Sequence, residues 1–208
     1  MPAEKFPECI YMTSGNPILG HHLKTLELAQ KELNRDIPLI VVANGAKNTH
    51  RIFSPQENLE LFKKGNEGGA FEGEIFALEL RELVAEYIQN AEIIIRRKEK
   101  GLDSNSPHIK KISEYFEDPT YAQKIHWIGD PEHTFPEDHT SSRFNALVYN
   151  ALNDPDEKER EKCYQQALKM AISATSGDNQ DKKAKFLIEE TQQRFRENPK
   201  LREYLSIV

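Results

Sequence analysis

The chain has 208 residues, of which 38% are hydrophobic and 30% charged, with 34 acidic against 28 basic side chains and a net charge of −6. This acidic balance argues against sequence-independent binding to nucleic acid, which relies on a basic surface. The chain has only two cysteines, Cys9 and Cys163, and they do not show the spacing of a zinc finger. This argues against a disulfide framework or a structural zinc site. No apolar stretch approaches the roughly 20 residues that span a bilayer, and no signal-like core opens the chain, so we expect a soluble, cytoplasmic protein outside the membrane.

Strand and helix patterns alternate over the first 130 residues. Apolar runs predict strands over about 9–13, 38–43, 92–95 and 124–128. A helix is predicted to begin at Ser54-Pro55, where Glu57 completes a capping box. Further helices are predicted over about 22–33, 74–89, 107–116, 141–152 and 156–170. The last predicted helix is an amphipathic segment from Ala184 to Phe195. The helix over 74–89 is predicted from Phe76, Leu80, Leu83, Val84 and Tyr87, which share one face at helical spacing.

This alternation predicts an α/β fold: a Rossmann-like parallel sheet of about five strands with flanking helices. We expect a single domain over residues 1–208, completed by C-terminal helices at about 141–208. Ligands of such sheets sit outside the carboxyl ends of the strands. Polar clusters follow the predicted strands at 14–22, 44–51, 96–98 and 129–130, which predicts a binding site at that edge.

The segment from Ser14 to Leu23 joins the first strand to the first helix through a turn that contains Gly15, Asn16 and Pro17. Backbone N–H groups at a helix start attract anions, and an imidazole can donate to a phosphoryl oxygen. Paired histidines open the helix, so the segment predicts a phosphate site.

Residues Asn16-Pro17-Ile18-Leu19-Gly20-His21-His22-Leu23 resemble, without a gap, the first motif of the nucleotidyltransferase-like superfamily. The chain looks most like its nicotinamide-mononucleotide and phosphopantetheine adenylyltransferases. Further matches follow in the family's order: Lys47 in a loop before Phe53-Ser54-Pro55-Gln56-Glu57, Arg96-Arg97 after a strand, Gly129-Asp130 after the next strand, and Ile172-Ser173-Ala174-Thr175-Ser176 at the expected start of the last helix. Together the matches cover residues 9 to 190.

The resemblance implies transfer of a nucleoside monophosphate, AMP from ATP more readily than CMP from CTP, to a small phosphorylated acceptor such as a mononucleotide, with release of pyrophosphate. Mg²⁺ would accompany the triphosphate and keep most of its waters, so no dedicated protein metal site is expected. A homo-oligomer is an open alternative. The implied catalytic residues are His22, His21, Lys47 and Arg96, and the implied nucleotide-binding residues are Ser14, Gly15, Asn16, Arg97, Gly129, Asp130, Ser173, Thr175 and Ser176.

Three departures leave alternatives open. Leu19 stands where the family has a first His or Thr, His21 replaces a glycine, and no arginine follows Ser176. The segment Thr140-Ser141-Ser142-Arg143 carries the arginine and competes for the last motif. A degenerate protein that binds nucleotide without turning it over is therefore the alternative function, and an interaction protein built on the charged helices near 154–200 is a weaker one. His126, His133 and His139 match no standard metal-ligand spacing.

Overall fold

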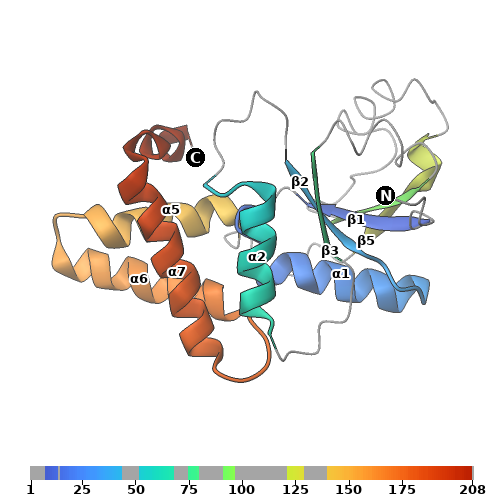
Figure 1. Cartoon of the computed structure of the whole chain (residues 1–208), viewed down its shortest axis with the longest axis horizontal. Helices are drawn as coiled ribbons and strands as arrows, with labels where there is room; N and C mark the ends of the chain where they lie inside the picture. Colours follow the sequence, from blue (N-terminus) through green and yellow to red (C-terminus); the bar gives the residue numbers. More distant parts are fainter. Residues whose placement is uncertain are drawn as a thin grey trace. The chain divides into compact units, whose positions relative to one another are not determined.

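The computed structural model describes residues 8–13, 15–43, 52–67, 75–79, 91–96, 121–128 and 140–207 (Figure 1). The chain falls into two compact units. The sheet unit comprises residues 1–13, 24–45 and 73–134, and the helical unit comprises residues 14–23, 46–72 and 135–208.

The sheet unit contains one parallel sheet of five strands. The strands are β1 (Cys9–Thr13), β2 (Leu39–Ala43), β3 (Ile75–Glu79), β4 (Glu92–Arg96) and β5 (Ile125–Ile128), in the spatial order β3-β2-β1-β4-β5. Ile10 pairs with Ile93 and Tyr11 with Ile94, and these four side chains are buried, as continuous apolar runs in a parallel sheet require. The prediction of an α/β protein with a parallel sheet is confirmed.

The prediction of a helix over 74–89 is wrong where the structure describes it, because residues 75–79 form strand β3. This strand pairs in parallel with β2, so that Leu39 lies opposite Ile75 and Val41 opposite Ala77. A pairing partner that is distant in sequence overrides the local helical pattern. The rest of that predicted helix, and the one predicted over 107–116, lie outside the described residues.

The helical unit contains α2 (Pro55–Gly65), α5 (Ser141–Asn153), α6 (Glu157–Ile172), α7 (Gln180–Glu197) and the 3-10 segment η2 (Pro199–Ile207). Helix α1 (Gly20–Leu33) begins in the helical unit and continues into the sheet unit. The core of the helical unit is apolar and comes from all its helices; its fully buried members include Phe53, Phe144, Val148, Ala167, Ala171, Ala184 and Ile188. The helices predicted over 141–152 and 156–170 and the final amphipathic one are confirmed.

Side-chain caps mark the starts of three of these helices, α2, α5 and α6, the last through Asp156, which accepts from the Lys158 N–H. Ser54 and Glu57 form the predicted capping box at the start of α2, with Pro55 as the first helical residue. Thr140 caps α5 by accepting a hydrogen bond from the Arg143 N–H. Within the described part of the chain, no helix combines the length and the apolar character needed to cross a membrane.

Candidate functional site

The turn between β1 and α1 is held by side chains from α2, α5 and the segment before α2. The side chain of Asn16 is 6% exposed and bonds both backbone groups of Phe53: its Oδ1 accepts from the Phe53 N–H at 3.0 Å, and its Nδ2 donates to the Phe53 carbonyl at 2.6 Å. The amide of Asn16 is therefore used by the protein itself, where the sequence predicted a contact with nucleotide.

Two further buried asparagines bond the backbone of the turn. Asn58 of α2 donates to the Gly15 carbonyl at 2.6 Å and accepts from the Ile18 N–H at 3.1 Å. Asn145 of α5 donates to the Asn16 carbonyl at 2.8 Å, and its Oδ1 is the one buried side-chain oxygen or nitrogen in the described residues that lacks a hydrogen-bond partner. This oxygen is an acceptor that a bound water or a ligand donor would satisfy.

His22 is buried against the turn with a defined pattern of hydrogen bonding. Its Nδ1 lies 2.9 Å from the Leu19 N and 3.2 Å from the Leu19 carbonyl oxygen. In the tautomer in which Nδ1 accepts from the Leu19 N–H, the ring proton is on Nε2. The ring lies directly against Gly15, where an added Cβ would sit 2.3 Å from Cε1 and 2.5 Å from Nε2. A residue with a side chain at position 15 would displace the imidazole, so this close approach requires glycine.

Leu19 points into the protein. Its side chain is 1% exposed and belongs to the core of the helical unit, while its N–H is bonded to His22 and its carbonyl accepts from the His22 N–H at 2.9 Å. Leu19 thus supplies no polar group to a ligand, and the role of the family's first His or Thr is not filled from this position.

Residues 173–176 do not lie at the start of the last helix, and this part of the prediction is wrong. Helix α6 extends to Ile172, Ser173 is its C-cap, and α7 begins only at Gln180. The hydroxyls bond within the protein: Ser173 donates to the Met170 carbonyl at 2.6 Å, Thr175 to the Ile172 carbonyl at 3.0 Å and Ser176 to Asn66 Oδ1 at 2.7 Å. Ser173 and Thr175 thus close the end of α6, and Ser176 bonds Gly65 and Asn66 at the end of α2.

The competing segment, Thr140 to Arg143, does lie at a helix start. It opens α5, and its Ser141 hydroxyl donates to the Pro17 carbonyl of the turn at 2.9 Å. The side chain of Arg143 is exposed. The structure therefore brings Ser141 of this segment to the turn that precedes His22.

The remaining predicted site residues are described only in part. The backbone places His21 in α1 and Arg96 at the end of β4, while their side chains are not among those described. Ser14, Lys47, Arg97, Gly129 and Asp130 lie outside the described residues. Within the described residues, no group of three or more His, Cys, Asp and Glu side chains could hold a metal ion.

In the sheet unit, Cys9 is not set up as a nucleophile. Burial, reinforced by the charge of Glu92, raises the pKa of the Cys9 thiol to about 11, and a protonated thiol is unreactive. Glu92 itself accepts from Arg35 at 2.8 Å and is bonded to His126 Nε2 at 2.9 Å. Partial burial works to raise the pKa of Glu92. The bonds to His126 and Arg35 outweigh it and hold that pKa below its usual value.

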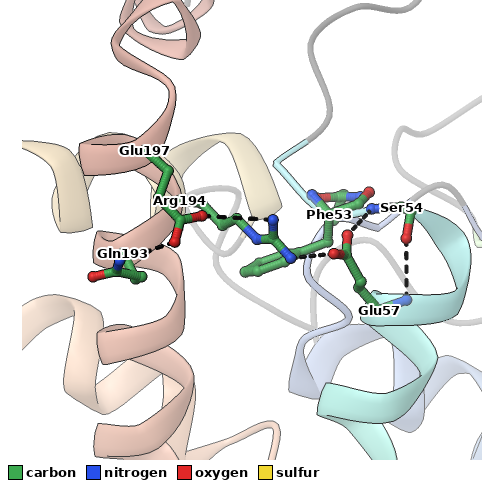
Figure 2. Close-up of polar contacts among 7 residues, drawn as sticks. Phe53, Ser54, Glu57, Gln193, Arg194 and Glu197 are labelled. Carbon is green, nitrogen blue, oxygen red and sulfur yellow. Dashed lines mark hydrogen bonds and ion pairs between the residues drawn. The ribbon is translucent and has the colours of Figure 1, made fainter.

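Arg194 of α7 contacts the start of α2 (Figure 2). Its guanidinium pairs with the Glu57 carboxylate and lies 5.8 Å from the centre of the Phe53 ring. Partial burial works to raise the pKa of Glu57, but hydrogen bonds with Ser54 and the charge of Arg194 outweigh it, and the pKa of Glu57 stays below its usual value. The carboxylate therefore remains charged and bonded at neutral pH.

Asn58, Asn145 and Arg194 were not predicted from the sequence. A signal existed for the two asparagines, because each lies beside the apolar stripe of a helix: Asn58 stands four residues before Phe62, and Asn145 three before Val148. A buried amide in that place needs hydrogen-bond partners. Comparison with protein-family models, with curated proteins and with solved structures found no match to this chain.

Proposed function

We propose that the chain is a nucleotidyltransferase with a Rossmann-like sheet, which transfers AMP from ATP to a small phosphorylated acceptor such as a mononucleotide. The strand order β3-β2-β1-β4-β5 supports the fold assignment, because β1 is the first strand of the chain and the order reverses on its two sides. In sheets of this order, ligands bind beyond the carboxyl ends of the strands at the reversal. The turn of Gly15 to Leu19 follows β1 directly in the chain.

The observation that carries the proposal is the hydrogen bond from the Leu19 N–H to Nδ1 of His22. In the tautomer in which Nδ1 accepts this bond, Nε2 carries the proton, and an N–H there is a donor suited to a phosphoryl oxygen. The three asparagines and Ser141 hold the surrounding turn, so the imidazole needs little reorganisation during the reaction. Preorganised donors of this kind provide much of the catalysis in phosphoryl transfer.

In the proposed reaction an oxygen of the acceptor's phosphate attacks the α-phosphorus of the triphosphate. The bond from that phosphorus to the oxygen bridging to the β-phosphate breaks, and pyrophosphate leaves with the electron pair. His22 Nε2–H would donate to the charged phosphate oxygens, and the Thr140–Arg143 segment is the better candidate for a second contact, since Ser141 bonds the same turn. Mg²⁺ would be held by phosphate oxygens and water, which needs no carboxylate cluster of the protein, and would neutralise phosphate charge.

The test uses His22→Asn. The amide oxygen of asparagine can stand in for Nδ1 and accept from the Leu19 N–H, whereas the Nε2 donor is lost. We expect pyrophosphate release from ATP with an acceptor panel to fall by roughly 10²–10³-fold, the loss typical of removing one such donor, with circular dichroism showing that the variant stays folded at the assay temperature. His126→Ala, which removes a histidine of the sheet unit bonded to Glu92, is the control and should keep wild-type activity. Equal turnover by His22→Asn and the wild-type chain would rule out this role.

A second candidate is a protein that binds nucleotide without turnover. The buried side chain of Leu19 favours it, since that position supplies no donor. This candidate predicts that ATP or CTP raises the melting temperature while no pyrophosphate appears with any acceptor. If no nucleotide raises the melting temperature, both candidates are refuted.

A further inference from the structure

Arg194 is bonded on both sides and is not available to a ligand of its own. Nη2 pairs with Glu57, Nη1 lies 3.7 Å from Glu197 Oε2 of the next helical turn, and the guanidinium lies 5.8 Å from the centre of the Phe53 ring. Figure 2 shows the side chain extended from α7 toward Phe53 and Glu57, with Ser54 beyond them. Its contacts therefore fix one short segment, residues 53–57.

That segment is the one to which the turn is bonded. Both backbone groups of Phe53 bond the side chain of Asn16, and the Phe53 ring is 1% exposed. Asn16 follows Gly15, against which the imidazole of His22 lies. A continuous series of contacts thus runs from Arg194 through Phe53 and Asn16 to the histidine.

We propose that Arg194 is a positioning residue for His22, acting through Phe53 and Asn16. A planar guanidinium can pair with the Glu57 carboxylate and stack on the Phe53 ring at the same time, which a lysine ammonium or an apolar side chain cannot do. Loss of Arg194 removes the Glu57 pairing and the contact with the Phe53 ring, so that only the capping box, core packing and the Asn16 bonds hold residues 53–57, and Phe53 can then shift against Asn16. The relevance for phosphate transfer rests on the proposed function, whereas the mechanical link from Arg194 to the turn does not.

The test is amide hydrogen exchange on the full-length chain, which requires no nucleotide. Three amides report on the series of contacts: Phe53, bonded to Asn16; Ile18, bonded to Asn58; and Leu19, bonded to His22. In Arg194→Met we expect them to exchange between about 2-fold and about 30-fold faster, measured relative to the amide of the core residue Val148, which is the range for residues that couple two sites. Nitrogen chemical shifts should also show a larger population of His22 with its proton on Nδ1.

Ala167→Gly is the matched control, because Ala167 is a core residue of α6 and the change weakens the helical unit without removing a contact of Arg194. It should speed up hydrogen exchange at the three amides and at the Val148 amide by the same factor. If Arg194→Met does the same and leaves the His22 shifts unaltered, Arg194 is merely structural and the proposal is overturned. Arg194→Lys, which keeps the charge opposite Glu57, should give a smaller selective effect and replaces the methionine variant if that one does not fold. A wild-type chain that releases no pyrophosphate would refute the proposed function but leave this comparison decisive.

Discussion

Replacing Asn16 with alanine is expected to lower the free energy of unfolding by about 2–6 kcal/mol. The change leaves the N–H and the carbonyl of Phe53 without their partners, and each buried polar group left unpaired costs about 1–3 kcal/mol. Water cannot easily replace the amide, because Asn16 is 6% and Phe53 1% exposed. Urea unfolding followed by circular dichroism measures the loss, with an unchanged dependence on urea showing that the unfolded state is the same.

The near-isosteric variant Asn16→Asp separates the hydrogen bonds from packing. A carboxylate can accept from the Phe53 N–H but repels the Phe53 carbonyl, so the folded protein raises the pKa of this carboxyl above its value in the unfolded chain. When a carboxyl group has a higher pKa in the folded than in the unfolded protein, the free energy of unfolding rises as the pH falls, because the folded state binds the proton more tightly. Asn16→Asp should therefore be most destabilised near neutral pH, relative to the wild-type chain, and should recover as the pH is lowered. A variant that matches the wild-type chain at every pH would contradict the bonds described for Asn16.

Gly20→Ala is expected to destabilise the protein by about 1–3 kcal/mol, the usual cost of overpacking. A Cβ at position 20 would lie 2.1 Å from the carbonyl oxygen of Ser173 and 2.6 Å from its carbon. Both atoms belong to the backbone at the end of α6, so a side-chain rotation cannot relieve the clash. The start of α1 and the end of α6 would have to separate, and thermal unfolding measures the cost.

Gly65→Ala is the control with the opposite sign. Gly65 is the last residue of α2, and an added Cβ would have the Thr175 Cγ2 as its nearest neighbour, at 3.7 Å, which is an ordinary contact. Here alanine only restricts the unfolded chain and should stabilise the protein by about 0.4–1 kcal/mol. Equal effects of the two substitutions would show that the close contact between Gly20 and Ser173 is not present in solution.

Local sequence patterns predicted those strands and helix starts whose conformation depends on residues close by in the chain. The apolar runs at 9–13 and 92–95 are long enough and rich enough in branched residues to read as strands, and the capping box at Ser54 marks the start of α2. Strand β3 was missed because Ile-Phe-Ala-Leu-Glu contains good helix formers and precedes leucines at helical spacing. Only its pairing with β2, more than thirty residues earlier in the chain, makes it a strand.

The site was predicted less well, for a different physical reason. Ser173 and Thr175 resemble a helix start in sequence, yet α6 continues to Ile172 with Ser173 as its C-cap, and α7 begins only at Gln180. Thr140 is a true N-cap, which its side-chain bond to the Arg143 N–H establishes. The amides of Asn58 and Asn145 gain their importance only through partners 40 to 129 residues away along the chain, and spacing along a single sequence does not reveal such pairs.

The most direct test of the proposed transfer is the fate of two labels in ATP, one on the α-phosphorus and one on the γ-phosphorus. With a mononucleotide as acceptor, nucleotidyl transfer places the α label in the acceptor product and the γ label in pyrophosphate, both suppressed in His22→Asn and both retained in His126→Ala. A γ label found on the acceptor would indicate a kinase, and a γ label released as orthophosphate would indicate a hydrolase. Either result would contradict nucleotidyl transfer by this chain.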